Sequence, residues 1–455
     1  MRPLSFTQLA SWAGGELLQG VPDDSVTAFS TDTRKLTGGE LFIALKGENF
    51  DAHDHLKEAV EKNVGALFVQ QLPTETQTFS GAIVRVRNTL TGLQELARNY
   101  LGSLNLKSLG ITGSSGKTST KDLTRAVISQ AFSVVATQGN LNNHIGVPLT
   151  ILSAEPEHEI GIFEMGMNHP GEIEVLAEIA QPTLAIITNI GSAHIENMKS
   201  RDAIAKEKGM LAEAVPSDGW VILSANDDFT ESIRARTRAQ VITAGINAGD
   251  VRATDLEMDI EGSRFKLSFE GNEVAASLPI VGEHMVSNAT LAAAAGLKLG
   301  MSLEQIAAGL ASAELSGGRL QQKTVAGLNV LDDSYNANPD SMRAALKTLR
   351  RLPTQGRRIA VLGLMAELGE HREDEHRKLG EAVAEFQIAV LLTIGEEGRF
   401  IAEAAENQVE TRVFDDHAQV SDFLRENASP ADLILLKGSR SAGMERVLTQ
   451  LTATA

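Results

Sequence analysis

The most informative segment of this 455-residue chain is Gly110-Ile111-Thr112-Gly113-Ser114-Ser115-Gly116-Lys117-Thr118-Ser119. The apolar run from Leu106 to Ile111 predicts a buried strand before it, and apolar residues at helical spacing from Thr118 to Ala131 predict a helix after it. A strand, a glycine-rich turn and a Gly-Lys-Thr helix start form a phosphate-binding loop, because backbone N–H groups and the helix N-terminus attract an anion there. We therefore expect this segment to bind a nucleoside triphosphate.

Each residue type in this segment has a chemical reason to be there. Gly113 and Gly116 would let the backbone turn its N–H groups inward, Lys117 would reach the outer phosphates, and the Thr118 hydroxyl would bind Mg²⁺. The general pattern G-x-x-x-x-G-K-[ST] is met except at its first glycine, where Ile111 stands. The alternative is a tight turn with a helix-capping serine or threonine. The predicted nucleotide-binding residues of the segment are Gly113, Ser114, Ser115, Gly116, Lys117, Thr118 and Ser119.

Composition narrows the class of protein. A chain of 455 residues is too long for one hydrophobic core, which suggests about three domains. The net charge of −18 argues against nucleic acid or an anionic membrane as the main partner. The absence of cysteine excludes disulfides and thiolate metal sites, and no apolar run is long enough for a signal peptide or a membrane span. We expect a cytoplasmic monomer that binds small molecules. We expect it neither to bind nucleic acid nor to insert into a membrane.

The pattern of apolar runs predicts an α/β protein with three domains. Residues 1–86 form an N-terminal α/β domain, residues 87–313 a central domain with a mostly parallel sheet around the phosphate-binding loop, and residues 314–455 a Rossmann-like α/β domain. Further predicted strands are 40–45, 66–69, 82–86, 160–163, 184–187, 220–223, 264–269, 274–278, 328–331, 358–362, 389–393 and 433–436. Further predicted helices are 55–63, 91–101, 286–299, 341–349 and 373–386.

Two polar residues follow predicted strands of the central domain. Glu164 ends one strand and His194 follows the next, and ligands of an open parallel sheet gather at the carboxyl ends of its strands. Taken singly, Glu164 is as well explained as a helix-capping acid and His194 as a loop histidine in solvent. Their joint position beside a phosphate-binding loop favours a Mg²⁺ site.

The sequence pattern does not decide the roles of two other segments. Residues 202–211 form an amphipathic helix whose lysines would ordinarily lie in solvent, and the pattern does not choose between Lys206 and Lys208. Residues 139–148 form a loop rich in amide side chains, which suit a substrate but are equally typical of turns.

The ordered motifs together resemble the Mur ligase family, and the resemblance runs nearly from end to end. The motifs that carry it are Ser30-Thr-Asp-Thr-Arg34, Gly39-Glu-Leu-Phe42, Ala44-Leu-Lys-Gly47, Asp51-Ala-His53, Thr112-Gly-Ser-Ser-Gly-Lys-Thr118, Gly139-Asn-Leu-Asn-Asn143, Glu164-Met-Gly166, Gly318-Arg-Leu320, Asp332-Asp-Ser-Tyr-Asn-Ala-Asn-Pro339, Met365-Ala-Glu-Leu-Gly369 and Lys437-Gly-Ser-Arg440.

The resemblance implies an enzyme that consumes ATP to join a free amine to a peptide carboxylate through an acyl phosphate. The stretches Asp333–Asn338 and Lys437–Arg440 imply that the substrates are UDP-N-acetylmuramoyl-tripeptide (UDP-MurNAc-tripeptide) and D-alanyl-D-alanine (D-Ala-D-Ala). A sibling ligase that adds a single amino acid is the alternative within the family. Outside it, the alternatives are a P-loop kinase and a nucleotide-switch protein.

The resemblance also implies roles for single residues. It assigns two Mg²⁺ ions, one on Thr118 and Glu164 and one on Glu164, His194 and a carbamylated lysine that aligns with Lys208. A lysine takes up CO₂ only as the neutral amine, so a lowered pKa is expected for it. The implied catalytic residues are Lys117, His194, Lys208 and Asn336, and the further nucleotide contacts are Asn288, Arg319 and Asp333. The implied substrate contacts are Ser30, Thr33, Arg34, Lys46, Gly47, Asn140, Asn142, Asn143, Tyr335 and Asn338.

The chain departs from the family pattern at two positions. Met285 stands where relatives usually have asparagine, which leaves the adenine contact to Asn288. Leu364 stands where an aspartate is common, which removes a carboxylate near the expected dipeptide site.

Overall fold

The computed structural model describes residues 1–72 and 79–453 as an α/β protein. It divides into two compact units. Unit 1 consists of Met1–Gly110, Phe132–Met165 and Glu174–Pro182. Unit 2 consists of Ile111–Ala131, Gly166–Ile173 and Thr183–Ala455.

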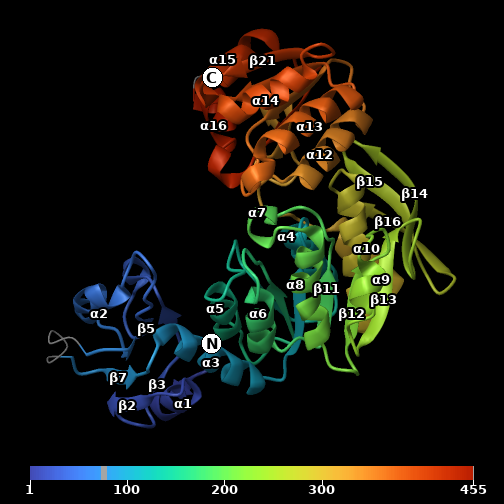
Figure 1. Ribbon diagram of the computed structural model, residues 1–455. Coiled ribbons are helices and arrows are strands. Elements are labelled where there is room, and N and C mark those ends of the chain that lie inside the picture. Colours follow the sequence, from blue (N-terminus) through green and yellow to red (C-terminus); the bar gives the residue numbers. More distant parts are fainter. Residues whose placement is uncertain (73–78, 454–455) are drawn as a thin grey trace. The chain divides into compact units, whose positions relative to one another are not determined.

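The first part of unit 1 is a five-stranded sheet (Figure 1, blue). Its strands, in spatial order, are β2 (Glu16–Gln19), β7 (Ala82–Arg85), β6 (Ala66–Val69), β5 (Leu41–Ile43) and β4 (Phe29–Ser30). The last four are parallel, β2 is antiparallel, and β1 (Leu4–Ser5) pairs with β3 (Ser25–Val26) in a separate ribbon. Phe42, Leu67 and Ile83 of this sheet are buried together. The helix predicted over 55–63 is confirmed as α2 (Leu56–Glu61), preceded by the 3₁₀ turn η2 (Ala52–His55).

The remainder of unit 1 carries two parallel strands, β9 (Val134–Ala136) and β10 (Ile160–Glu164). Besides α2, the helices of unit 1 are α1 (Phe6–Trp12), α3 (Thr89–Gly102) and α5 (Gly146–Leu152). A further helix, α6 (Glu172–Ala180), begins in unit 2 and continues into unit 1. Asn88 caps α3, because its side chain accepts a hydrogen bond from the Thr91 N–H. β8 (Lys107–Thr112) leads across the unit boundary to the phosphate-binding loop, as its apolar sequence predicts.

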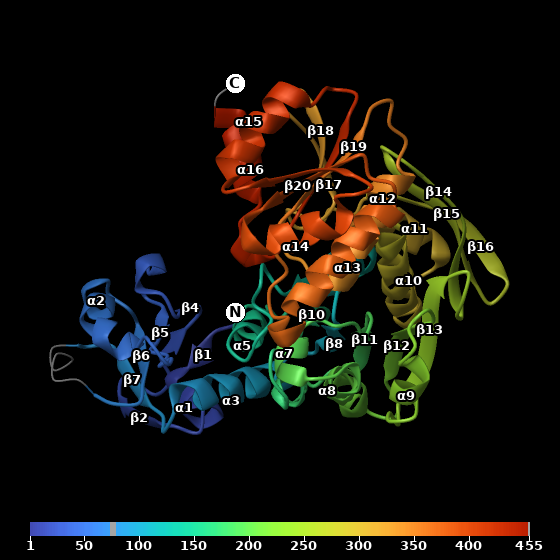
Figure 2. The same ribbon diagram turned by 45° about the horizontal axis from the view of Figure 1, so that its top comes forward.

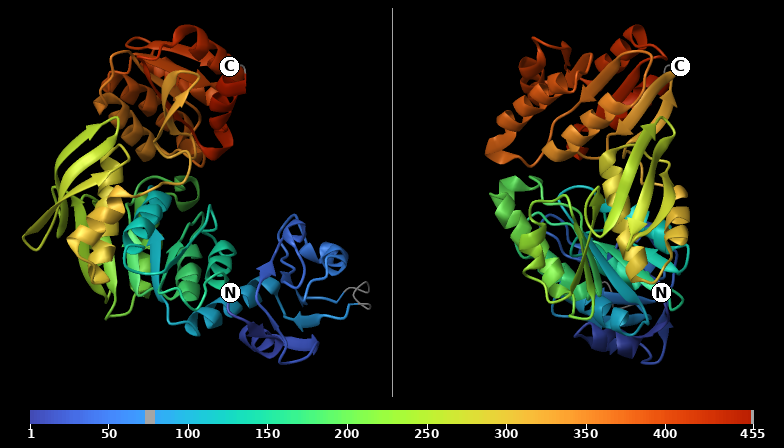
Figure 3. Two further views of the ribbon diagram at one scale, coloured as in Figure 1. Left: turned by 180° about the vertical axis from the view of Figure 1, so that it is seen from behind. Right: turned by 90° about the vertical axis from the view of Figure 1, so that its right-hand side faces the viewer.

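Unit 2 continues with parallel strands that become an antiparallel ribbon. The parallel strands are β11 (Leu184–Ile187), β12 (Trp220–Ser224), β13 (Gln240–Ile246) and β14 (Val251–Asp259). β15 (Gly262–Phe269) and β16 (Asn272–Leu278) then pair antiparallel, as predicted. Figure 3 shows these strands beside the yellow helices α10 (Glu283–Lys298) and α11 (Leu303–Ala311). The other helices of this part are α4 (Lys117–Ile128), α7 (Ile195–Met198), α8 (Arg201–Ala214) and α9 (Thr230–Arg234).

The last part of unit 2 is a six-stranded sheet with helices on both faces (Figure 2). Its strands, in spatial order, are β17 (Gln321–Val325), β18 (Leu328–Asp333), β22 (Leu433–Lys437), β19 (Arg358–Leu362), β20 (Val390–Ile394) and β21 (Glu410–Phe414). All pairs except β17–β18 are parallel. The helices are α12 (Pro339–Arg351), α13 (Arg372–Glu385), α14 (Gly395–Ala405), α15 (His417–Asn427) and α16 (Glu445–Ala453). Figure 2 shows the sheet between α12 and α13 on one side and α15 and α16 on the other.

The register of this sheet brings distant motifs together. Asp333 of β18 pairs with Lys437 of β22, and Lys437 pairs with Leu362 of β19. All three residues end their strands, so the motifs that follow them meet at one carboxyl edge. Within residues 1–72 and 79–453, no helix has the length and hydropathy needed to cross a membrane.

Candidate functional site

The phosphate-binding loop has no room for side chains at its two inner glycines. Gly113 has φ 154°, and a Cβ placed there would overlap the Thr188 hydroxyl. Gly116 has φ 77° and is the N-cap residue before α4, and a Cβ there would lie 2.9 Å from the amide of Asn288. Both positions therefore favour glycine, because of their positive φ and the close neighbouring side chains.

Two residues after β11 hold the loop in shape. The Asn189 side chain accepts from the Ser115 N–H at 2.9 Å, and its carbonyl oxygen accepts from the Ser114 N–H at 3.0 Å. The Thr188 hydroxyl donates to the Ser115 carbonyl oxygen at 2.6 Å. The sequence analysis missed Thr188 and Asn189, although they directly follow a predicted strand at the edge where ligands gather.

Lys117 and Asn288 both lie at the loop. The Lys117 Nζ donates to the Gly113 carbonyl oxygen at 2.8 Å, so the ammonium contacts the main chain of the loop. Asn288 is buried on α10 against Gly116, and Met285, one turn earlier on the same helix, is also buried.

Glu164, a predicted Mg²⁺ ligand, ends β10 in unit 1 and is buried. Its Oε1 accepts from the Asn142 amide at 2.8 Å, and its Oε2 is buried with no hydrogen-bond partner among the described residues. An unpaired buried carboxylate oxygen is costly, and a bound cation would satisfy it. Carboxylate oxygens also suit Mg²⁺, so the environment of Glu164 fits that ion.

Lys208 is distinguished from Lys206 by the fold. Lys208 lies on the buried face of α8 and is 0% exposed, whereas Lys206 of the same helix is exposed. The Lys208 Nζ has no hydrogen-bond partner among the described residues. Burial, assisted by the Lys117 charge, lowers the pKa of Lys208 well below its ordinary value. Burial therefore favours the neutral amine that CO₂ uptake requires.

His194 precedes α7 in a left-handed conformation with φ 65°. Its Nδ1 lies 2.5 Å from an oxygen of Glu367 without hydrogen-bond geometry, and the interaction with His194 lowers the pKa of that carboxyl. Within the described residues, no three His, Asp or Glu side chains form a ready-made metal site. The predicted ligand set does not require such a group, because it includes a threonine hydroxyl and a modified lysine.

Asp333 and Lys437 form a buried ion pair at the carboxyl edge of the last sheet. Their side chains lie 2.7 Å apart, and Asp333 also accepts from the Leu320 N–H at 3.2 Å. Burial raises the pKa of Asp333, and the Lys437 ammonium opposes this rise. The predicted nucleotide contact Arg319 lies beside this pair, with its guanidinium 3.9 Å from the Tyr335 ring centroid.

The residues predicted to contact the dipeptide follow β18. The Lys437 Nζ donates to the Asn336 carbonyl oxygen at 2.8 Å, and the Asn336 side chain is exposed. Asn338 caps α12, and its amide donates to the Ser115 hydroxyl of the phosphate-binding loop at 2.8 Å. Leu364, the unusual residue of this region, is half-buried.

The amide-rich loop forms turn contacts as well as the contact with Glu164. The Asn143 side chain accepts from the Gly146 N–H at 2.9 Å at the start of α5, while Asn140 is exposed. Asn142 is thus the member of this loop that contacts another predicted site residue.

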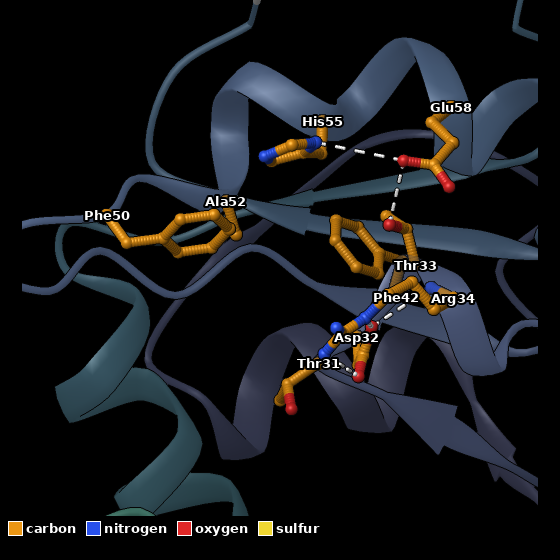
Figure 4. A pocket seen from close by; sticks show the side chains of 9 residues that line it. All are labelled: Thr31, Asp32, Thr33, Arg34, Phe42, Phe50, Ala52, His55 and Glu58. Carbon is orange, nitrogen blue, oxygen red and sulfur yellow. Dashed lines mark hydrogen bonds and ion pairs between the residues drawn. The ribbon is translucent and has the colours of Figure 1, made fainter.

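A separate cavity of about 480 Å³ lies in the N-terminal sheet (Figure 4). It is lined by Thr31, Asp32, Thr33, Arg34, Phe42, Phe50, Ala52, His55 and Glu58. Of the predicted substrate contacts, Thr33 and Arg34 line it, whereas Ser30, Lys46 and Gly47 do not.

The polar groups of this cavity already have partners. Arg34 pairs with Asp32 at 2.9 Å, and the Thr33 hydroxyl donates to Glu58 at 2.9 Å. The Phe50 ring stacks on His55 with centroids 5.1 Å apart, although Phe50 is 58% exposed. The sequence analysis missed Phe50, His55 and Glu58, and Phe50 and His55 lie within five residues of the Asp51-Ala-His53 motif.

Lys46 is held outside the cavity lining by a chain of contacts. It pairs with Asp51 at 3.1 Å, and the other Asp51 oxygen lies 2.6 Å from the His53 Nδ1. The His53 Nε2 accepts from the Gln70 N–H at 2.9 Å, so Nδ1 carries the proton that Asp51 accepts. Burial alone would raise the pKa of Asp51, but the hydrogen bonds from His53 and Lys46 lower it to about 2.

Two family models match the chain. The Mur ligase middle domain matches residues 111–296, and the model described as Mur ligase, glutamate ligase domain matches residues 318–440. The UDP-N-acetylmuramoyl-tripeptide–D-alanyl-D-alanine ligase of Bacillus subtilis is 39% identical over 93% of this chain and 92% of its own length. The ligase of the same name from Escherichia coli is 37% identical over 99% of both chains.

Solved structures agree with these relatives. A crystal structure of MurF from Acinetobacter baumannii matches with a TM-score of 0.92 and 33% identity, over 100% of this chain and 99% of that one. MurF from Thermotoga maritima, solved in complex with ADP, matches with a TM-score of 0.83 and 27% identity over 94% and 98%. The chain therefore belongs to the Mur ligase family, alongside relatives named UDP-N-acetylmuramoyl-tripeptide–D-alanyl-D-alanine ligase.

Proposed function

We infer that this chain is an ATP-dependent ligase of peptidoglycan biosynthesis. It joins D-Ala-D-Ala to UDP-MurNAc-tripeptide and gives UDP-MurNAc-pentapeptide, ADP and phosphate. The observation that carries this inference is the likeness to ligases of that name over nearly the whole chain. The phosphate-binding loop and the ADP complex of the Thermotoga maritima relative support ATP as the co-substrate.

The first chemical step is a phosphoryl transfer. The tripeptide carboxylate attacks the γ-phosphorus in line, a bond to the bridging oxygen breaks, and ADP leaves an acyl phosphate behind. Such a transfer depends on positioning and charge neutralisation rather than on covalent help from the protein. The loop N–H groups not used by Asn189 would hold phosphate oxygens. Lys117 would release its hydrogen bond to the Gly113 carbonyl oxygen and bind the outer phosphates of ATP instead.

Mg²⁺, when bound, supplies positive charge to the phosphate oxygens. Thr118 and Glu164 would hold one ion, and Glu164, His194 and Lys208 the second. The unpaired Glu164 oxygen and the buried Lys208 amine, whose pKa is lowered, support these assignments. The Lys208 nitrogen would attack CO₂, form a C–N bond and release a proton, and the resulting carbamate is an oxygen anion that suits Mg²⁺.

The second chemical step is an acyl transfer. The D-Ala-D-Ala amine attacks the activated carbonyl, and phosphate leaves. Tyr335, Asn336 and Asn338 would position the dipeptide, and the Lys437 contact with the Asn336 carbonyl would fix this segment. Asn338 also contacts Ser115, so the same segment reaches the phosphate-binding loop.

The remaining assignments concern substrate and nucleotide binding. Asn288 would contact adenine, while Arg319 and Asp333 would contact phosphate and ribose. We propose that the N-terminal cavity binds the uridine diphosphate, with Arg34 of its lining and Lys46 outside the lining supplying positive charge. Ser30, Thr33 and Gly47 would complete this site, and Asn140 and Asn143 would contact the peptide. The three-domain division at residues 86 and 313, the monomeric state and the cytoplasmic location stay predictions.

Phosphate release tests this function directly. The assay contains Mg-ATP and UDP-MurNAc-tripeptide, with and without D-Ala-D-Ala, and parallel reactions contain single D- and L-amino acids. We expect release only with the dipeptide, together with a UDP-linked pentapeptide by mass spectrometry. Release with a single amino acid would instead identify a sibling ligase, and ATP binding without release in any reaction would contradict ligase activity.

A further inference from the structure

The two oxygens of the Glu164 carboxylate lie in different environments. Glu164 ends β10 and is 2% exposed. Its Oε1 accepts a hydrogen bond from the Asn142 amide at 2.8 Å, whereas its Oε2 is buried and has no hydrogen-bond partner in the described part of the chain. A buried carboxylate oxygen without a partner is costly, so a cation at Oε2 would stabilise the site. One oxygen is thus engaged by the protein, and the other is left for a ligand.

The donor to Oε1 is a neutral side chain, which matters for the charge of the site. A carboxylate only accepts hydrogen bonds, so the amide nitrogen of Asn142, and not its oxygen, faces Glu164. A lysine or arginine in this place would neutralise the carboxylate. The amide instead fixes the orientation of the carboxylate and leaves its negative charge to a metal ion.

The loop that carries Asn142 is held on both sides of this residue. Before it, the main chain of Leu141 packs directly on Gly146 of α5, where any Cβ would overlap it. After it, the His144 carbonyl oxygen accepts from the Gln94 side chain of α3 at 3.1 Å. These contacts place the amide, so its position does not depend on the bond to Glu164 alone.

The main chain of Glu164 is held by the same segment of the chain. The Glu164 N–H donates to the hydroxyl of buried Thr137 at 3.0 Å, and the Thr137 N–H donates to the Ile162 carbonyl oxygen at 3.0 Å. Residues 137 and 142 therefore fix Glu164 at its main chain and at one side-chain oxygen. The carboxylate cannot turn without losing the hydrogen bond at Oε1.

We propose that Asn142 is a positioning residue that makes Glu164 a ligand through one oxygen and thereby favours Mg²⁺ over Ca²⁺. Mg²⁺ demands a near-ideal octahedral arrangement of ligands, whereas Ca²⁺ takes more oxygens in flexible geometry and readily binds both oxygens of one carboxylate. An Oε1 engaged by the amide leaves only Oε2 for the ion. This proposal rests on the proposed function, because that function assigns Glu164 to Mg²⁺.

The first test measures metal binding without turnover. Free Mn²⁺, which substitutes for Mg²⁺, is counted by electron paramagnetic resonance in the presence of ADP, and a protein-free titration corrects for Mn²⁺ held by ADP alone. Asn142→Leu keeps a similar shape without the donor, and Gln138→Leu makes the same kind of change at an exposed amide of the same segment. We expect the Mn²⁺ dissociation constant to rise about 10-fold in Asn142→Leu and to match wild type in Gln138→Leu.

The second test measures the displacement of bound Mn²⁺ by Ca²⁺. The freed Oε1 of Asn142→Leu lets Glu164 bind Ca²⁺ through both oxygens, so the ratio of the Ca²⁺ to the Mn²⁺ dissociation constant should fall below that of wild type. A purely structural loosening would weaken both ions and leave the ratio unchanged. An unchanged ratio would therefore overturn the proposed selectivity, and an Mn²⁺ affinity within about twofold of wild type would overturn the positioning role.

Glu164→Gln separates failure of this proposal from failure of the proposed function. If Glu164→Gln binds Mn²⁺ as wild type does, Glu164 is not a ligand, and the metal assignment fails together with this proposal. If Glu164→Gln loses Mn²⁺ but Asn142→Leu does not, only the role of Asn142 fails. Phosphate release by wild type is measured in parallel, so failure of the ligase assignment is seen separately. Asn142→Ala, which adds no bulk, carries both tests if Asn142→Leu does not fold.

Discussion

The phosphate-binding loop and the N-terminal cavity hold their charged groups in different ways. In the loop, Lys117 rests on a backbone carbonyl, and Thr188 and Asn189 fix the surrounding main chain. In the cavity region, Arg34 and Lys46 are exposed and already paired with aspartates. The loop main chain is thus held by protein contacts alone, whereas a diphosphate at the cavity would have to compete with Asp32 and Asp51. Preorganisation of this kind favours tight, geometrically strict binding at the loop.

The largest effect is expected at the loop. Lys117→Ala removes the ammonium that would neutralise the transferred phosphate, and we expect kcat to fall by about 10³-fold or more. Phosphate release measures this loss, with Lys206→Ala as the exposed-lysine control. Near-normal turnover by Lys117→Ala would show that Lys117 is not needed for phosphoryl transfer, and would contradict the role proposed for the loop.

A second large effect is expected at Lys208. Lys208→Ala removes a buried amine and with it the proposed carbamate, so turnover should fall by about 10²-fold. Acetate or formate should restore part of the activity, because a small carboxylate can occupy the space and supply oxygen ligands. Lys206→Ala again serves as control, and full activity of Lys208→Ala would exclude a catalytic role.

A smaller and more selective effect is expected at the cavity. Arg34→Ala should raise the KM for UDP-MurNAc-tripeptide by about 10-fold and leave the KM for ATP unchanged. Steady-state kinetics on both substrates measures the difference. Lys35→Ala, an exposed neighbour, is the control. Equal changes in both KM values would show that cavity and loop are not separate binding sites.

The smallest effect concerns the pH dependence of stability. The pKa of Asp51 is lowered from 3.8 to about 2, so its charged form stabilises the fold above pH 3.8 and this contribution is lost as the pH falls through about 2. Asp51→Asn lacks the contribution, and we expect it to be about 1 kcal/mol less stable at pH 7. Urea unfolding between pH 7 and pH 2 measures the difference, which should shrink at the acidic end. If the difference in unfolding free energy between wild type and Asp51→Asn stayed the same from pH 7 to pH 2, the charge of Asp51 would not be its cause.

The sequence predicted the elements that surround the loop because their patterns are local. The bounds of β6 and β11 match the predicted runs, and β8 and α4 differ by single residues at their starts. The strands β14 and β21 were missed because they carry polar and charged residues at several exposed positions, which weakens the apolar pattern of a strand.

Side-chain environments were harder to predict than strands. Lys206 and Lys208 are equivalent in an amphipathic pattern, and only packing in three dimensions buries one of them. Phe50, His55 and Glu58 line the cavity from separate turns, so no single motif contains them. The motif of Glu367 was recognised, but its contact with His194 depends on how two distant loops fold.

The overlap between Gly113 and the Thr188 hydroxyl also limits how this enzyme can evolve. Any other residue at position 113 would require a simultaneous change at position 188, and Thr188 itself bonds the Ser115 carbonyl oxygen. Two coupled substitutions in separate codons arise far more rarely than one. An inhibitor that draws its affinity from the backbone N–H groups at this glycine would therefore leave few single-step routes to resistance.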